Sequence, residues 1–185
     1  MNKRVLIVVA IIFGIFGIGS AAAQAFTLTS EDVKGQLTDT QVLAGFGCTG
    51  KNISPALHWI DAPKNTKSFA VTVYDPDAPT GSGWWHWVIV NLSAEIHGLP
   101  ADAGNPHKDQ APKGSLQSVT DYGTPGFGGA CPPAGDKPHR YIFTVYALDV
   151  AKLEMNEQSS PALVGFALHQ HAIAKASLLA YYGRD

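Results

Sequence analysis

The sequence predicts a mainly β fold that ends in one C-terminal helix. Four segments show the period-two alternation of side chains that is typical of half-buried strands. Long stretches rich in glycine, proline and aspartate separate some of these segments, and the longest of them spans residues 100–135. One segment near the C-terminus carries the start and stop signals of a helix, so we expect few helices in the molecule.

The chain begins with a segment that has the features of a secretory signal peptide. A cationic start precedes an apolar run over residues 5–19 and a small-residue end over residues 20–25. A transmembrane anchor is the alternative, but the apolar run is shorter than the ~20 residues that a helix needs to span a bilayer. We therefore expect residues 1–25 to be removed by cleavage after Ala23 or Ala25, and the mature protein to be periplasmic or secreted.

Length and charge limit what the remaining chain can do. Residues 26–185 are expected to form a single domain that is large enough for a proper core. Removing the two basic residues of the leader from the total of 13 leaves 11 basic against 15 acidic residues, a net charge near -4. The domain has no run of Lys or Arg, so nucleic acid is not an expected partner. It also has no second apolar run long enough to span a membrane.

The alternation predicts both the strands and their faces. The predicted strands are Ala56–Ile60, Ser68–Asp75, Trp85–Leu92 and His139–Leu148. In the second strand, the residues of one face are Phe69, Val71 and Val73. In the third, the two faces are Trp85, Trp87 and Ile89, and His86, Val88, Val90 and Leu92. In the fourth, His139 and Tyr141 share one face because side chains alternate along a strand.

One helix is predicted over the C-terminal segment. Ser160 can cap its N-terminus, Pro161 suits the first helical position, and Gly183 lies just past the expected end. Its apolar face is expected to consist of Leu163, Phe166, Ala167, Ile173, Ala174 and Leu178. Such a helix should pack on a sheet or close over its rim.

The domain contains two cysteines, Cys48 and Cys131. An even number of cysteines in an exported chain indicates a disulfide, and two buried thiols are the alternative. A bridge between residues so far apart would stabilise the fold by roughly 4–5 kcal/mol on the chain-entropy model, less any strain.

Ionisable side chains gather where predicted strands meet loops. Asp75 ends one strand, His86 lies near the start of the next, and His139 and Tyr141 open a third. Strand ends that are distant in sequence can converge, so these residues suggest one pocket. The imidazoles and the phenol can donate hydrogen bonds to an anion, and the carboxylate can hold an imidazole in the right tautomer.

Each of these residues also has a purely structural interpretation. Asp75 and Asp77 can form the side-chain–backbone bonds of a turn, which is the interpretation we favour for Asp77 alone. His86, flanked by tryptophans, can be a satisfied core residue. Residues 45–50 match the glycine spacing of a dinucleotide-binding loop, but no helix is expected after them, so we interpret them as an ordinary loop.

The chain resembles the phosphatidylethanolamine-binding protein family, also called the Raf kinase inhibitor protein family, and most of all its compact bacterial YbhB/YbcL-type branch. The stretches that carry the resemblance are residues 52–59, 75–79, 83–87, 128–133, 139–141 and 171–184. The resemblance implies a sandwich of two antiparallel β-sheets with few short helices and an anion pocket at one end. It also supports pairing of Cys48 with Cys131, because their loops resemble those of exported bacterial members.

The resemblance also implies which residues form the pocket. The positions that match the family's pocket Asp, two His and Tyr are Asp75, His86, His139 and Tyr141. Further lining is expected from Pro79, Trp84 and the loop from Gly129 to Pro133. Family pockets accept phosphate-type groups, including phospholipid head groups.

We therefore expect an exported binding protein, without cofactor or metal, that recognises a phosphate-type anion or a phospholipid head group. It would act by occupying or inhibiting a partner. An acid–base enzyme acting on phosphoesters is one alternative, although no nucleophile with an adjacent base is evident. A metal site formed by His86, His139 and Asp75 is the other.

Overall fold

The structure, a computed structural model, describes residues 25–185. Its elements are β1 (Thr27–Thr29), β2 (Ala44–Gly45), β3 (Cys48–Thr49), β4 (Leu57–Ile60), β5 (Ser68–Asp75), β6 (Trp84–Ser93), β7 (Gly98–Leu99), β8 (Leu116–Gln117), β9 (His139–Leu148), α1 (Pro161–His171) and β10 (Ala172–Tyr182). The predicted leader, apart from Ala25, lies outside the described residues, so its cleavage stays a prediction.

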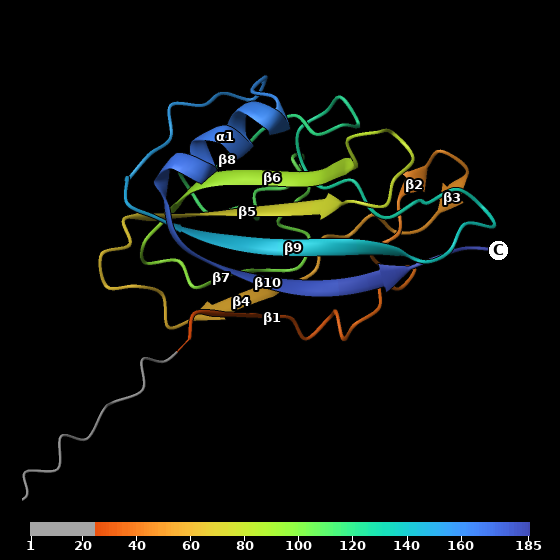
Figure 1. The fold of residues 1–185 in the computed structure, drawn as a ribbon, viewed down its shortest axis with the longest axis horizontal. Helices are drawn as coiled ribbons and strands as arrows, with labels where there is room; N and C mark the ends of the chain where they lie inside the picture. Colours follow the sequence, from red (N-terminus) through yellow and green to blue (C-terminus); the bar gives the residue numbers. More distant parts are fainter. Residues whose placement is uncertain (1–24) are drawn as a thin grey trace, which may run out of the picture.

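Antiparallel pairing builds two main sheets and one small hairpin. The larger sheet has five strands in the order β10-β9-β5-β6-β8, and the smaller has three in the order β1-β4-β7. The strands β2 and β3 pair with each other and lie beyond the end of β5 (Figure 1). The predicted mainly β fold with antiparallel sheets is therefore confirmed.

Two apolar clusters hold the layers together. The first lies between the two sheets and includes Trp59 of β4, Phe69 of β5 and Phe143 of β9, all fully buried. The second lies between the larger sheet and α1 and includes Val88 and Val164. Burying one such large apolar side chain stabilises the folded state by ~1.5–3 kcal/mol, so these clusters supply most of the free energy that holds the layers together. The predicted faces of β5 and β9 are confirmed by this division.

The strand β6 departs from the predicted alternation at two bulges. Val73 pairs with Trp87 while Tyr74 pairs with Trp85, which leaves His86 as an extra residue. A second irregularity lies near Asn91, whose φ is 61°. The predicted faces of β6 are therefore wrong at both ends, because each extra residue reverses the alternation beyond it. Residues on the unexpected side are Trp85, which packs against the cluster under α1, and Leu92, which belongs to the cluster between the sheets.

The predicted C-terminal helix is present in its first half and absent in its second. Its predicted apolar face is wrong as well, because Leu163 and Phe166 are exposed whereas Val164 and Leu168 are buried. The Ser160 side chain accepts a hydrogen bond from the N–H of Leu163 at 3.3 Å, as expected for a helix N-cap. The chain turns extended at Ala172, after which residues predicted to continue the helix form β10.

Pairing with β9 explains why this segment is a strand. β10 runs antiparallel to β9 along its whole length, from Ala172 to Tyr182. Ala176 and Ala180 are buried on the core side, whereas Leu179 remains 40% exposed. This period-two pattern is present in the sequence, but Ala, Leu and Lys are also strong helix formers. Long-range pairing therefore outweighs the local helix propensity.

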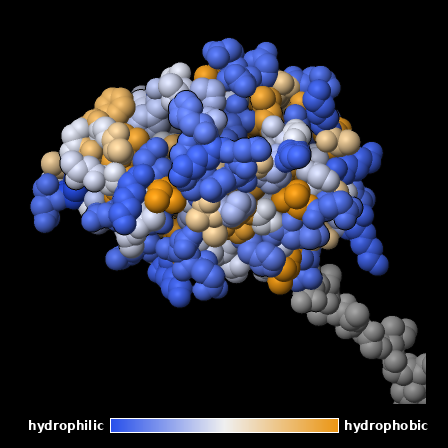
Figure 2. Space-filling view, turned by 180° about the vertical axis from the view of Figure 1, so that it is seen from behind, coloured by the Kyte–Doolittle hydropathy of each residue, from blue (hydrophilic) through white to orange (hydrophobic). Residues whose placement is uncertain are grey.

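No helix within residues 25–185 is long and apolar enough to cross a membrane. The face turned away from the viewer in Figure 1 carries mainly hydrophilic side chains, with apolar ones scattered among them (Figure 2). Scattered apolar side chains are normal on a protein surface and mark no interface by themselves.

Candidate functional site

The candidate site lies at the end of the larger sheet where β5 ends and where β6 and β9 begin. Asp75 is the last residue of β5, Trp84 is the first of β6 and His139 is the first of β9. Because neighbouring strands of the sheet are antiparallel, these positions, although distant in sequence, meet at the same end of the sheet (Figure 1).

Asp75 is buried, and both oxygens of its carboxylate accept hydrogen bonds from neighbouring residues. Oδ1 accepts hydrogen bonds from the N–H groups of Asp77 at 2.8 Å and Ala78 at 3.1 Å. Oδ2 accepts a hydrogen bond from Nδ1 of His139 at 2.8 Å. Asp75 therefore makes the expected turn bonds with one oxygen and bonds the His139 imidazole with the other, and its part in ligand binding stays a prediction.

His139 is hydrogen-bonded to one carboxylate and lies near a second. Its ring is 3% exposed, and because Nδ1 donates to Asp75, Nε2 is the nitrogen left for other contacts. Nε2 lies 3.6 Å from the carboxylate of Asp136, which is too long for a good hydrogen bond. The orientation of the ring is therefore fixed while Nε2 stays available at the cavity.

His86 reaches the site because it is the extra residue of the β6 bulge. Its Nδ1 donates to the carbonyl oxygen of Gly128 at 2.8 Å, and its own carbonyl accepts from the Gly128 N–H at 2.8 Å. The ring lies edge-on to Tyr141, with centroids 5.1 Å apart. The expectation that His86 shares a face with Val88 is wrong. His86 packs against Tyr141, which belongs to the cluster between the sheets, whereas Val88 belongs to the cluster under α1.

Burial controls the charge of His86. It lowers the pKa of the imidazole below its ordinary value of 6.5, while the hydrogen bond to Gly128 and the charge of Asp75 oppose that shift. A neutral ring that donates through Nδ1 carries a lone pair on Nε2, and this atom has no hydrogen-bond partner among residues 25–185.

Two further buried donors of the site lack partners in the described part of the chain. They are the phenol of Tyr141 and the indole N–H of Trp84. Burial raises the pKa of the Tyr141 phenol, so this group keeps its proton and can donate it in a hydrogen bond. Three side chains thus bring unsatisfied polar atoms to one place.

These side chains surround a cavity of about 190 Å³. This is smaller than the roughly 300–1,000 Å³ of pockets for drug-sized ligands, so it suits a small group. Of the residues expected to line the pocket, the structure brings together Asp75, Pro79, Trp84, His86, Cys131, Pro132, Pro133, His139 and Tyr141. Lining residues that sequence reasoning missed are Phe46, Ala78, Thr80 and Tyr122.

Gly129 belongs to the expected loop but does not itself line the cavity. Its N–H donates to Oδ1 of Asn52 at 2.7 Å, and its carbonyl accepts from the Tyr122 hydroxyl at 2.9 Å. A Cβ at this position would lie 2.2 Å from the carbonyl oxygen of Gln41, so only glycine permits this close approach. Gly129 therefore supports Tyr122, which does line the cavity.

Asp77 has a different role from the turn bonds that we expected. Its carboxylate accepts two hydrogen bonds from the Arg140 guanidinium, at 2.9 and 2.8 Å, and one from the Arg140 N–H at 2.9 Å. This fork-like pairing holds the pKa of Asp77 well below its usual range. The pair ties the turn after β5 to the start of β9 beside the pocket.

The disulfide predicted from the two cysteines is present. Cys48 and Cys131 are bonded across a sequence separation of 83 residues. The bond joins β3 to the loop that contains Pro132 and Pro133, and Cys131 itself lines the cavity. The loop interpretation of residues 45–50 is also correct, because they form the β2–β3 hairpin and no helix follows them.

The side chains of the site bear on the two alternative functions, an acid–base enzyme and a metal site. Both oxygens of Asp75 are engaged, Cys131 is in the disulfide, and the Thr80 hydroxyl donates to the Gly83 carbonyl. Residues 25–185 hold no group of three or more His, Cys, Asp or Glu that could hold a metal ion. Neither the enzyme nor the metal alternative is therefore favoured by this geometry.

Comparison with known proteins identifies the family. The model of the family described as phosphatidylethanolamine-binding protein matches residues 33–183. The chain belongs to the phosphatidylethanolamine-binding protein family. Members of this family are in general binding proteins, and the family in general binds phospholipid head groups.

Bacterial members of the family are close relatives. The protein YbcL of Escherichia coli K12 is 53% identical over 165 residues, which cover 88% of this chain and 90% of YbcL. YbhB of the same organism is 50% identical over 157 residues, which cover 84% of this chain and 98% of YbhB. The crystal structure of E. coli YbcL matches with a TM-score of 0.85 at 52% identity, covering 86% of this chain and 99% of that one. The predicted family and bacterial branch are thus confirmed.

Proposed function

We propose that this protein is exported and binds a small phosphate-type anion, free or as a phospholipid head group, in the pocket between Asp75 and Tyr141. The observation that carries the proposal is the set of buried polar atoms without partners within residues 25–185, which are Nε1 of Trp84, Nε2 of His86 and Oη of Tyr141. An unsatisfied buried polar group costs ~1–3 kcal/mol. Three of them around one small cavity indicate a ligand whose oxygens satisfy them.

The charges of the site imply that a proton accompanies the anion. The buried carboxylate of Asp75 repels a second negative charge unless a positive group lies between them. The neutral His86 is the group that can become positive, because a bound anion favours the protonated imidazole. In that form Nε2 donates a hydrogen bond to the anion, and His139 and Tyr141 supply others.

Export is supported by the leader-like start of the sequence and by the disulfide, because disulfides persist in oxidising compartments. Inhibition or modulation of a protein partner stays a prediction from the family resemblance.

Calorimetric titration with phosphate and phosphoethanolamine tests the proposal. Charged hydrogen bonds contribute ~1.5–3 kcal/mol, so His139→Ala should weaken binding on the order of tenfold or more. Asp75→Asn should also weaken it, because the imidazole loses the carboxylate that orients it. The matched control is His171→Ala, which removes a histidine bonded to Asp149 at 3.0 Å on the surface, outside the pocket lining.

The outcomes separate cleanly. The control should bind like the wild type, and melting curves should show that all variants are folded. Equal affinity of the wild type and both pocket variants would show that the anion binds elsewhere. Absence of binding by the folded wild type to either ligand would refute the proposed function.

A further inference from the structure

Phe46 is exposed at the cavity in a way that an anion site alone does not explain. Its side chain lines the cavity, yet the residue is 75% exposed, more than any other large apolar residue of the described chain. Its ring centroid lies 5.7 Å from that of Tyr122, another lining residue. A ligand in contact with Phe46 would cover apolar surface that otherwise faces water.

The backbone holds Phe46 in a conformation that bulky residues rarely adopt. Phe46 and Gly47 are the two residues between β2 and β3, and their φ angles are 51° and 80°. A two-residue hairpin turn with positive φ at both positions favours Asn or Gly at the first of them. Phenylalanine is therefore unfavourable for the turn itself, which points to a use for its side chain.

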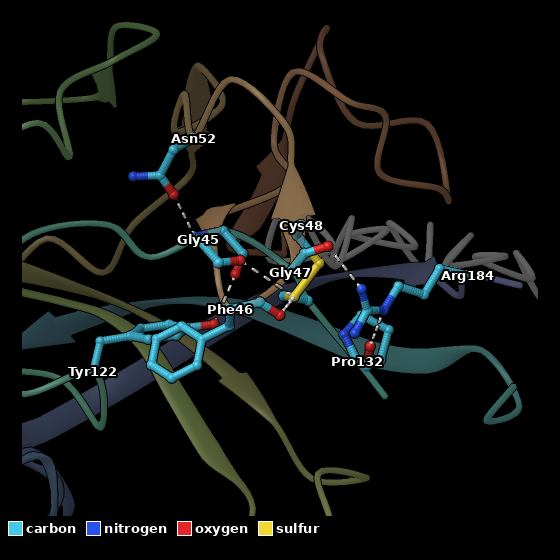
Figure 3. The surroundings of a disulfide bond; sticks show 10 residues. Gly45, Phe46, Gly47, Cys48, Asn52, Tyr122, Pro132 and Arg184 are labelled. Carbon is cyan, nitrogen blue, oxygen red and sulfur yellow. Dashed lines mark hydrogen bonds between the residues drawn. A yellow bond between two sulfur atoms is a disulfide. The ribbon is translucent and has the colours of Figure 1, made fainter. Parts of the chain in front are cut away.

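Two connections fix this hairpin against the loop opposite it. The disulfide joins Cys48 to Cys131, and the Arg184 guanidinium donates to the carbonyl oxygens of Gly47 at 3.1 Å and Pro132 at 2.6 Å. Figure 3 shows the guanidinium beside the disulfide, with its bonds to both loops. The position of Phe46 relative to Pro132 is therefore set by two independent restraints.

The lining has a polar and an apolar part. The unpartnered atoms of His86 and Tyr141 are buried, whereas Phe46 is open to solvent. Pro132 and Pro133 line the same cavity and have no backbone N–H, so they cannot donate to an anion there. A ligand with an anionic end and an apolar substituent matches this division.

We propose that Phe46 is a specificity-determining residue that packs against the organic substituent of a phosphate ester, so that the pocket prefers organic phosphates to inorganic phosphate. This inference rests on the proposed function and adds to it the residue that distinguishes phosphate esters from inorganic phosphate. Soluble phosphate esters and phospholipids share this chemistry.

The test is a titration of the wild type, Phe46→Ala and Phe166→Ala with three ligands. The ligands are inorganic phosphate, n-butyl phosphate, and dihexanoylphosphatidylethanolamine below its micelle-forming concentration. Phe166, 60% exposed on α1, is the matched control because it lies outside the pocket. From the area that an alkyl chain can cover, the wild type should bind an ester about five- to tenfold more tightly than phosphate.

Phe46→Ala should remove most of that preference, because it should weaken binding of the esters several-fold more than binding of inorganic phosphate. A second variant, Phe46→Asn, should remove the preference as well and also raise the melting temperature, because Asn suits the turn. This gain in stability would exclude damage to the fold as the cause. The ester that shows the effect identifies a soluble or a lipid source.

An ester preference that survives in Phe46→Ala, or no preference in the wild type, would overturn the role of Phe46 and leave the anion site standing. Failure of the wild type to bind any of the three ligands would refute the anion site itself, and this inference with it.

Discussion

Asp75 shows how a single carboxylate transfers the rigidity of a turn to a binding group. One oxygen is fixed by two backbone N–H groups of the turn, and the other fixes the ring of His139. The imidazole is thus oriented in the free protein, which reduces the conformational entropy that would be lost when a ligand binds. In the proposed function Asp75 would act on the ligand through His139, which makes it a positioning residue.

Replacing Tyr141 by phenylalanine should separate binding from stability. The variant loses a donor to the anion, so affinity for phosphate should fall about tenfold. The same hydroxyl is buried without a partner in the described chain, so its removal should raise the free energy of unfolding by ~1 kcal/mol without ligand. Urea unfolding and calorimetry measure the two effects, with Tyr181→Phe at a 42% exposed position as control. A loss of both stability and affinity would contradict the assigned role.

The pH dependence follows from the buried His86. Burial lowers its pKa in the folded protein, whereas the unfolded chain takes up a proton below its ordinary value of 6.5. Without anion, this group therefore removes stability as the pH falls below that value. Bound anion reverses the shift, so affinity should weaken as the pH rises through the window between the lowered and the bound-state pKa, and level off above it.

Sulfate is the right probe for this dependence because it stays a dianion between pH 5 and 8. Millimolar sulfate should raise the melting temperature more at pH 5.5 than at pH 8. Sodium chloride at equal ionic strength controls for general salt effects. Charged groups that also act on this ring are Asp75 and Asp121, and His139 lines the same cavity. A sulfate effect that is the same at both pH values would argue against proton uptake.

At the scale of elements, the sequence predicted the strands whose alternation is unbroken and missed those shaped by distant partners. β5 and β9 have the predicted bounds, Ser68–Asp75 and His139–Leu148, because each is paired with a strand on both sides over most of its length. The bulge at His86 was not predictable, since it depends on Gly128 bonding to both the ring and the carbonyl of that residue. β10 was mistaken for helix because its alanines satisfy both periodicities.

Two substitutions should distinguish the helix from the strand that follows it. Gly165→Ala in α1 adds a Cβ that meets nothing within 4 Å, so it should stabilise the protein by ~0.5–1 kcal/mol. Lys175→Thr, at an exposed position of β10, should also stabilise it, by up to ~1 kcal/mol, because Thr favours strands. Chemical denaturation measures both. Destabilisation by Lys175→Thr would indicate that the segment is helical in solution.

At the scale of the whole molecule, the disulfide should be the largest single restraint. It closes a loop with a sequence separation of 83 residues, so replacing both cysteines by alanine should lower the free energy of unfolding by ~2–5 kcal/mol. Dithiothreitol should destabilise the wild type by a similar amount and leave the double variant unchanged. Equal stability of the wild type and the double variant would show that the bond constrains the unfolded chain little.

The lining of the candidate site could be predicted from the sequence as far as its residues lie near strand ends. Asp75, His86, His139 and Tyr141 met that condition, and the family resemblance added the prolines. Tyr122 lies in the long segment 100–135, where no periodicity marks a position, and it is placed by Asp121 accepting a hydrogen bond from the Trp85 N–H at 2.8 Å. Phe46 carried no signal either, since an aromatic residue between glycines in a loop has many explanations.

The bulge in β6 has a consequence for redesign of this protein. Deleting His86 would restore an even ladder between β5 and β6, and a procedure that rewards regular strand pairing would choose that deletion. The shortened strand would pair more regularly with β5, but it would no longer place an imidazole at this end of the sheet. The bulge therefore supplies a histidine to the candidate pocket. An idealised version of this fold would lose that histidine and, on the proposed function, its affinity for anions.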